Sequence, residues 1–225
     1  MNTINQLSTL AVCYVSLFLL CFWVWKIKSA SLTSLKVQNG NWIFLHIRHA
    51  GGMIIMTLIP IFFLSVIPED LFAWPKGVKG MQVLVLMITG LILLTLSANE
   101  IDKTTEKKIA INRWSSFHAV LHVILRNSFL VCYEWFFRGV VLFSCVFVLG
   151  LIPAVIINVA LYAFIHSFNG RKEFLGSIPL GIILCVLTLW WHSVWPAILL
   201  HMVLSSTYES IILSQFFSKR SKLVL

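Results

Sequence analysis

The sequence is poor in charged residues, which make up only 11% of its 225 positions, while hydrophobic residues make up 59%. A soluble protein of this length does not need that much apolar surface, and it needs more charge to cover its outside. The shortage of charge therefore excludes an ordinary soluble domain and indicates a polytopic membrane protein. Because the apolar runs are continuous and do not alternate, they predict helices rather than the strands of a barrel.

Acidic residues are the scarcest charged class, since 8 Asp and Glu stand against 17 Lys and Arg and leave a net charge of +9. The basic residues lie between the apolar runs, so the expected partners are anionic membrane lipids and not nucleic acid. All five cysteines lie in apolar runs without a Cys-x-x-Cys spacing, which argues against a disulfide framework or a zinc site. His118 and His122 lack a His-Glu-x-x-His pattern, and no metal or cofactor is predicted.

The apolar runs predict an all-α polytopic transmembrane helix bundle of about seven spans. The first run has no basic n-region and no small-residue cleavage site, so we interpret it as an anchored span. Residues 99–126 are polar and basic at first and then amphipathic, which predicts a cytoplasmic segment with a helix lying in the interface. Pro196 suits the first turn of the last span. The predicted spans are Leu7–Trp25, Ala50–Ile67, Met81–Ala98, Asn127–Gly150, Leu151–His166, Leu175–Trp191 and Trp195–Phe217.

The distribution of basic residues predicts the orientation of this bundle. With the N-terminus outside, the inner segments 26–49, 99–127, 167–174 and 218–225 hold 14 of the 17 Lys and Arg, and the outer segments hold only Lys76 and Lys79. This asymmetry follows the positive-inside rule, so the C-terminus is expected in the cytoplasm. We divide the chain into a three-span region (1–98), the interfacial segment (99–126) and a four-span core (115–217).

Charged groups inside the predicted spans are the first functional candidates. Glu134 and Arg138 are four residues apart, which places them on one helix face in the favourable acid-first order. A charge in hydrocarbon costs several kcal/mol, so such residues face protein or water. Antiparallel packing of the fourth and fifth spans is expected to bring Glu134 to the depth of His166. There a carboxylate and an imidazole can jointly hold and deprotonate a water molecule.

A second group of polar residues lies on the last span, where His201 is followed on one face by Ser205 and Glu209. A histidine and a hydroxyl one turn apart can donate hydrogen bonds to a developing oxyanion. Counting residues, however, puts His201 near the outer end of its span and Glu134 near the inner end of its own. Either the Trp190–Pro196 connection dips into the membrane or the predicted boundaries are displaced.

Each candidate also has a purely structural interpretation. Glu134 and Arg138 can form a buried pair that contributes packing specificity and no chemistry. His166, at a helix end, can be an interfacial histidine, and Ser205 can be a packing group that bonds to backbone.

Taken together, these residues resemble the CPBP family (CAAX protease and bacteriocin-processing, or Abi), a family of intramembrane glutamic proteases. The resemblance covers about residues 115–210. The family motif Glu-Glu-x-x-x-Arg corresponds to Tyr133–Gly139, the Phe-x-x-x-His helix end to Tyr162–His166, and Trp-Pro-Ala followed by His-x-x-x-Asn to Trp195–Ser205.

The resemblance implies an endopeptidase, independent of metal, that cuts a peptide bond near the C-terminus or membrane edge of a small protein or peptide. Carried over by position, Glu134 and His166 hold and activate water, His201 stabilises the oxyanion, and Arg138 orients the glutamate. Tyr133 replaces the first glutamate of the family motif and is a poor base, because an unperturbed phenol has a pKa near 10. Ser205 replaces the asparagine, so Tyr133 and Ser205 are at most accessory residues.

These two departures support an alternative hypothesis, in which the chain is a catalytically inactive relative that acts in bacteriocin immunity or as a peptide-binding scaffold. A transporter that uses the buried acids as a proton relay is a third class. For the protease and its inactive alternative, the expected partners are membrane lipids and a peptide or protein. The expected location is a bacterial cytoplasmic membrane.

Overall fold

The structure is a computed structural model that describes residues 3–26, 42–58, 60–61, 73–75, 77–105 and 116–223. Within these ranges the regular elements are all helical, and no strand occurs. The helices are α1 (Thr3–Lys26), α2 (Trp42–Met53), α4 (Gly80–Thr105), α5 (Ser116–Glu134), α6 (Leu142–Leu149), α7 (Leu151–His166), α8 (Arg171–Trp191) and α9 (Trp195–Leu223). Two π-helical segments, η1 (Ile54–Leu58) and η3 (Trp135–Val141), and the 3₁₀ turn η4 (Ser167–Asn169) connect them.

Five of the helical segments in the described ranges are long and apolar enough to cross a membrane, by length and composition. They are Ser8–Lys26, Phe117–Leu149, Leu151–Asn169, Arg171–Trp191 and Trp195–Ser214. The second and third predicted spans correspond to shorter apolar helices, Ile43–Leu58 and Gly80–Leu96. The all-helical class is thus confirmed, whereas five of the seven predicted spans reach the length of a full span.

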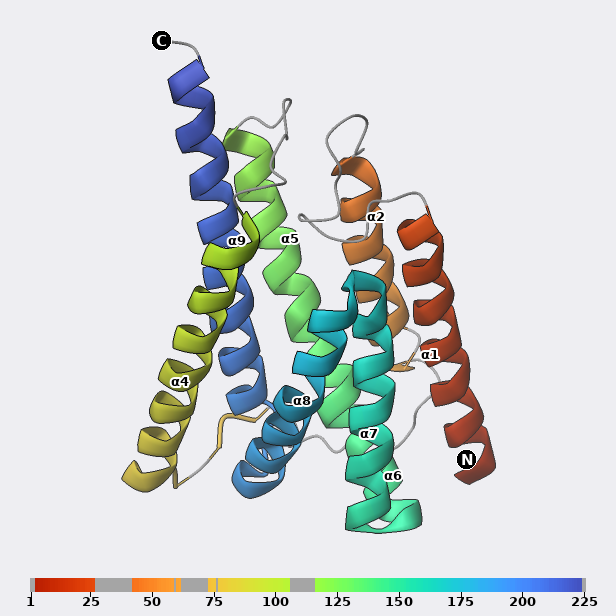
Figure 1. The fold of residues 1–225 in the computed structure, drawn as a ribbon. Coiled ribbons are helices and arrows are strands. Elements are labelled where there is room, and N and C mark those ends of the chain that lie inside the picture. The colour runs from red at the N-terminus through yellow and green to blue at the C-terminus, as the bar shows by residue number, and fades with distance from the viewer. Residues whose placement is uncertain are drawn as a thin grey trace.

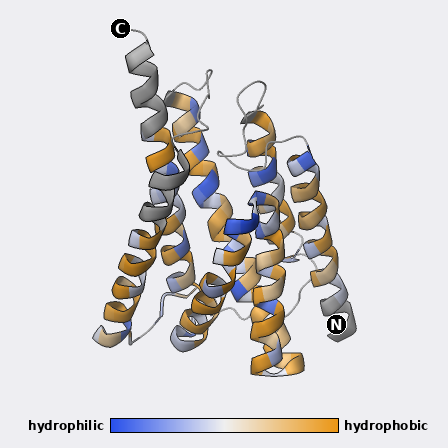
Figure 2. Ribbon diagram, viewed as in Figure 1, coloured by the Kyte–Doolittle hydropathy of each residue, from blue (hydrophilic) through white to orange (hydrophobic). Residues whose placement is uncertain are grey.

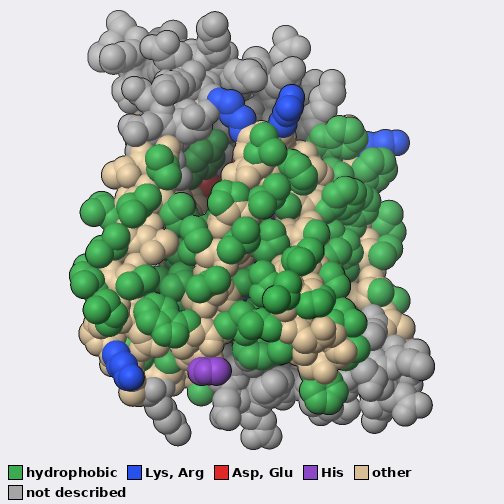
Figure 3. All heavy atoms as spheres, turned by 60° about the horizontal axis from the view of Figure 1, so that its bottom comes forward, with side chains coloured by type: hydrophobic (Ala, Val, Ile, Leu, Met, Phe, Trp, Pro, Cys, Tyr) green, Lys and Arg blue, Asp and Glu red, His purple; other side chains and the backbone are tan. Residues whose placement is uncertain are grey.

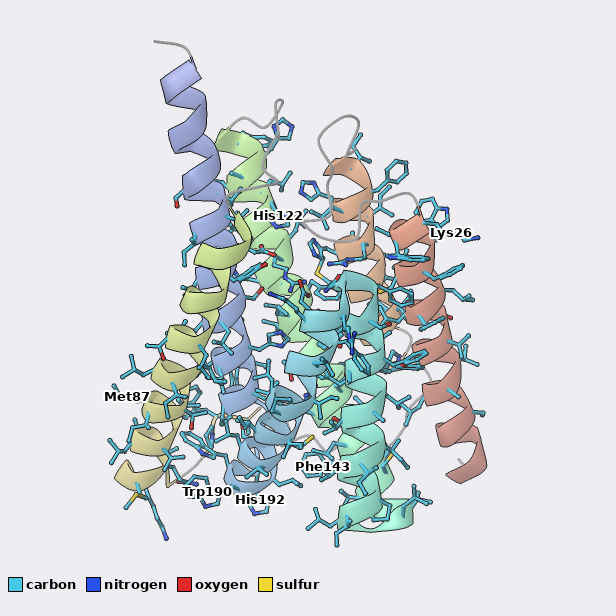
Figure 4. All side chains as sticks on the ribbon, in the orientation of Figure 1. Lys26, Met87, His122, Phe143, Trp190 and His192 are labelled. Carbon is cyan, nitrogen blue, oxygen red and sulfur yellow. The ribbon has the colours of Figure 1, made fainter. Side chains whose placement is uncertain are left out.

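Successive helical columns run in alternating directions (Figure 1). α1, α4, α7 and α9 run towards the end of the bundle where the C-terminus lies, and α2, α5 and α8 run the opposite way. The side-chain view places Lys26 and His122 towards that end and Trp190 and His192 at the opposite end (Figure 4). At the latter end the rings of Trp74 and Trp195 lie 5.9 Å apart.

The fourth predicted span begins much earlier than the sequence suggested. A single column comprising α5, η3 and α6 extends over Phe117–Leu149, so residues 117–126 continue into the span and do not form a separate helix. Trp114, which the interfacial prediction also included in its range, lies outside the described residues. Because the column starts earlier, Glu134 stands about 25 Å along it, near mid-length and not near the inner end.

The second helix also differs from its prediction. It is already formed at Trp42 and continues through η1 to Leu58, whereas Ala50–Ile67 was expected, and residues 62–67 lie outside the described ranges. The sequence was misleading here because His46, Arg48 and His49 suggested a polar connection. In the structure all three residues belong to the helix, and their side chains are buried inside the bundle.

The central column forms the core, and the outer helices expose many large apolar side chains. Phe136, Phe137 and Leu142 are completely buried in the column, which packs against α2, α7, α8 and α9. Hydrophobic residues predominate along the helices (Figure 2). Hydrophobic side chains cover most of the face in Figure 3, where Lys and Arg lie at the margins and an acidic side chain is visible in a hollow. A surface this apolar is stable only in contact with lipid or protein.

The π-helical turn η3 begins directly after Glu134 and contains Arg138. All seven of its residues are buried, and its Phe137 carbonyl accepts a hydrogen bond from Asn158 Nδ2 of α7 at 2.6 Å. Cys185 Sγ of α8 donates in turn to Asn158 Oδ1 at 3.3 Å. Isolated π-helical turns recur at functional sites. Here the turn fixes how the two charged side chains of the column are aimed.

Candidate active site

Glu134 and Arg138 form the predicted ion pair. Both side chains are completely buried, and Arg138 Nε lies 3.4 Å from Glu134 Oε2. The guanidinium carbon of Arg138 also lies 4.0 Å from the centre of the Tyr162 ring on α7. The arginine is therefore held from two sides, by a carboxylate on its own column and by an aromatic face on the neighbouring helix.

His201 of α9 contacts the other oxygen of the same carboxylate. Its Nδ1 lies 2.5 Å from Glu134 Oε1, so the acid is bonded to an imidazole on one side and paired with a guanidinium on the other. A carboxylate oxygen accepts, so Nδ1 carries the hydrogen. In the neutral ring Nε2 is then the nitrogen with a free lone pair. The depth conflict in the sequence argument disappears, because Glu134 lies at mid-length of its column.

His166 ends α7 beside His201. Its Nδ1 donates to the Tyr162 carbonyl at 2.9 Å, which fixes the ring and again leaves Nε2 as the acceptor nitrogen of a neutral imidazole. The centres of the two imidazole rings lie 6.4 Å apart. The two histidines thus come from separate helices, α7 and α9, and present the same kind of nitrogen to one region.

The two imidazoles share a small polar cavity of about 30 Å³. This volume is enough for water, and the polar groups in its wall are suitable partners for it. The cavity is lined by Cys21, Arg48, Arg126, Phe129, Leu130, Tyr133, Ile165, His166, Asn169 and His201. Helices from both the N-terminal and the C-terminal parts of the chain therefore build its wall.

Glu134 does not belong to this wall, and the imidazole that it touches is His201 and not His166. The sequence argument paired Glu134 with His166 because neighbouring antiparallel helices match in depth. Depth alone does not decide which way a side chain points, and the turn of the column aims Glu134 at α9. Tyr133, one position earlier, faces the cavity in its place.

Tyr133 lines the cavity wall beside both histidines. Its ring centre lies 6.1 Å from that of His166 and 6.1 Å from that of His201, with nearly perpendicular planes. The side chain is 2% exposed, and its hydroxyl has no hydrogen-bond partner among the described residues.

Ser205, the other accessory candidate, faces α5 and does not line the cavity. Its Oγ accepts from Arg126 Nε at 3.0 Å. Arg126 also lies 3.4 Å from Glu209, whose other carboxylate oxygen is 2.8 Å from His122 Nε2. The predicted common face of His201, Ser205 and Glu209 is therefore confirmed, and it packs against α5.

Sequence reasoning missed several residues of the cavity wall, above all Arg48, Arg126 and Asn169, where Arg48 Nη1 donates to Asn169 Oδ1 at 3.4 Å. A signal for Arg126 was present, because Arg126, Leu130 and Tyr133 follow the i, i+4, i+7 pattern of a single helix face. No group of three or more His, Cys, Asp or Glu within the described ranges is arranged to hold a metal ion.

Comparison with known families gives a match in the same part of the chain. Residues 114–207 match the family model described as type II CAAX prenyl endopeptidase Rce1-like. This segment is Rce1-like. No curated protein and no solved structure matches the chain.

The Rce1-like segment confirms the family resemblance inferred from the motifs, and it contains Glu134, Arg138, His166 and His201. Cys21 and Arg48, which also line the cavity, come from helices that precede the segment. Since the family is one of proteases, the match supports a CAAX-type protease. Together with the five apolar helices it indicates an integral membrane protein that takes a peptide or protein substrate.

Proposed function

We propose that the protein is an intramembrane endopeptidase that hydrolyses a peptide bond near the C-terminus or membrane edge of a small protein or peptide. The single observation that carries this proposal is the cavity, where imidazoles from two helices face a space sized for water while a buried Glu134–Arg138 pair supports one of them. Such an arrangement has the parts that water-dependent peptide hydrolysis requires.

In the proposed mechanism His201 Nε2 takes a proton from the attacking water. Glu134 accepts from His201 Nδ1, holds the ring in the required tautomer and stabilises the imidazolium that forms, and Arg138 fixes the carboxylate. His166 Nε2 accepts a second hydrogen bond from the water and orients it. His201 then returns the proton to the leaving amine, so acid, base and water are all supplied without a metal.

These roles revise the assignment carried over from the motifs. There, Glu134 and His166 shared the water and His201 stabilised the oxyanion. The contact between Glu134 and His201, and the position of Glu134 behind the cavity wall, favour His201 as the base. Arg138 keeps the role given to it by the motif argument.

The remaining features of the prediction belong to this proposal. The protein spans a bacterial cytoplasmic membrane about seven times, with its N-terminus outside and its C-terminus in the cytoplasm. In support, 14 of the 17 Lys and Arg fall in the sequence segments assigned to the inner side, and one of them, Lys26, lies towards the C-terminal end of the bundle (Figure 4). The family description names a prenyl endopeptidase, so a prenylated cysteine peptide is the first substrate to test.

The test measures cleavage of an internally quenched S-farnesyl peptide by the purified full-length protein in liposomes. Glu134→Gln, His166→Ala and His201→Ala should each lose activity by about 10²-fold or more while the protein remains in the membrane. Thr95→Ala is the matched control, because the Thr95 hydroxyl bonds only the Ile92 carbonyl of its own helix, on an exposed face.

Two results would contradict the proposal. Normal cleavage by Glu134→Gln would show that the assigned residues do not act together. No cleavage by the unaltered protein, either of the farnesyl peptide or of its unprenylated counterpart, would instead favour the catalytically inactive alternative.

A further inference from the structure

The hydroxyl of Tyr133 is a buried donor without a protein acceptor. Its oxygen is inaccessible from outside, and none of the described residues accepts a hydrogen bond from it. Buried polar groups in native proteins are nearly always paired, so an unpaired one calls for a partner that enters the site. The Tyr133 side chain lines the cavity, which supplies the place for that partner.

Two polar residues of the same wall, His166 and His201, have the opposite hydrogen-bonding character to the phenol. His166 and His201 both use Nδ1 to donate outside the cavity, to the Tyr162 carbonyl and to Glu134, and so keep Nε2 as an acceptor. A phenol, whose ordinary pKa is near 10, keeps its proton at neutral pH and donates. The wall therefore combines two acceptors suited to a water molecule with a neutral donor whose ring centre lies 6.1 Å from that of each histidine.

Tyr162 provides an internal comparison. It is also completely buried, and its hydroxyl also has no partner among the described residues, but it does not line the cavity. Its ring packs against Arg138, which accounts for an aromatic side chain there without any role for the oxygen. The Tyr162 ring also lies near both imidazoles, with its centre 4.4 Å from that of His166 and 6.1 Å from that of His201. Of these two unpaired hydroxyls, however, only that of Tyr133 belongs to a side chain that lines the cavity.

We propose that Tyr133 is a catalytic residue whose hydroxyl donates a hydrogen bond to the carbonyl oxygen of the scissile peptide. The inference rests on the proposed function. The water oxygen bonds to the carbonyl carbon, the carbon–oxygen π pair moves onto the oxygen, and His201 Nε2 receives the water proton. The Tyr133 O–H stabilises the resulting oxyanion. When the carbonyl reforms, the carbon–nitrogen bond breaks and the nitrogen takes the proton from His201, which leaves an acid and an amine.

The first experiment is Tyr133→Phe, which removes one oxygen and keeps the ring. Because the hydrogen bond strengthens as the oxyanion forms, kcat on the farnesyl peptide should fall about 100-fold while KM changes less than about twofold. The affinity for a matched peptidyl aldehyde, whose hydrate imitates the tetrahedral intermediate, should fall with kcat/KM. Tyr14→Phe is the control, since the Tyr14 hydroxyl donates to the Leu161 carbonyl at 3.0 Å away from the cavity, and it should keep the original kcat.

A second variant retains the hydroxyl, so its result does not depend on whether the protein folds without the Tyr133 oxygen. Incorporation of 3,5-difluorotyrosine at position 133 lowers the pKa of the phenol. The alkaline limb of the kcat profile should then move to lower pH, because an ionised phenol no longer donates. A packing role would leave this limb unmoved.

The outcomes separate the two proposals. If Tyr133→Phe keeps its kcat and the difluorotyrosine protein keeps its pH profile while Glu134→Gln and His201→Ala are inactive, the role of Tyr133 is refuted and the protease proposal stands. If Glu134→Gln and His201→Ala also cleave normally, the proposed function itself fails.

Discussion

Two buried clusters in this protein have the same three side chains, and only one of them adjoins the cavity through its histidine. In the first cluster Glu134 contacts His201 and Arg138. In the second cluster Glu209 contacts His122 and Arg126. Both connect α5 or its π-helical continuation with α9. Glu134 is completely buried, whereas the side chain of Glu209 is 12% exposed.

The clusters differ in which imidazole nitrogen faces the acid. His201 uses Nδ1 and turns its other edge to the cavity, whereas His122 bonds Glu209 through Nε2 and does not line the cavity. The rings of His46 and His49 lie against His122 at 5.9 and 5.5 Å between centres. Composition therefore does not distinguish the cluster that we propose as catalytic from the one that we interpret as structural. The two differ in which imidazole nitrogen is left unbonded by the acid.

The largest difference is expected for the two acids. Glu134→Gln should reduce peptide cleavage by about 10³-fold or more, because the amide no longer stabilises the imidazolium of His201. Glu209→Gln should keep activity within about tenfold of the original. Rates are to be compared per folded molecule, with size-exclusion chromatography as the measure of folding. Equal losses in the two variants would show that the clusters act as one unit.

Substitutions of the two arginines should differ in how much they destabilise the folded protein. Arg138→Met leaves the Glu134 carboxylate buried without its guanidinium, and breaking such a pair costs about 3–5 kcal/mol. Arg126→Met should cost about 1 kcal/mol or less, because Arg126 and Glu209 are both partly exposed. Thermal unfolding in detergent measures which of the two variants loses more stability. A larger loss of Tm for Arg126→Met would reverse our assignment of which pair is fully desolvated.

The smallest effect is expected at Ser205. Ser205→Ala removes the acceptor of the Arg126 Nε hydrogen bond but leaves the ion pair with Glu209 in place. Cleavage should fall by less than about tenfold with little change in Tm, since a single partly exposed hydrogen bond contributes about 1 kcal/mol. A loss as large as that of His201→Ala would instead make Ser205 part of the catalytic group.

The sequence predicted the site best at residues whose type carries a high free-energy cost in an apolar segment. Glu134, Arg138 and His201 stand out as polar groups in apolar runs, and the structure brings all three together. The helical class followed from continuous apolar runs. The division into regions 1–98, 99–126 and 115–217 stays a prediction.

The failures share a physical cause, which is that hydropathy does not distinguish a polar residue in water from one buried against polar partners. His49 falls in a predicted inner segment (26–49) and His122 in the predicted interfacial segment (99–126), although both are buried inside the bundle. The same confusion displaced the starts of the second and fourth helices. The partner of Glu134 was not predictable either, because it depends on the π-helical turn and on a hydrogen bond from Asn158, 21 positions from Phe137 in the chain.

The small size of the cavity has a consequence for turnover. A space of about 30 Å³ suits water, so under the proposed function we expect a scissile peptide to reach His201 only when neighbouring helices move apart. The rate of the proposed hydrolysis should then depend on how readily the helices separate against lateral pressure from the surrounding acyl chains. Thicker or more ordered bilayers should slow catalysis without any change in the chemistry at the histidines.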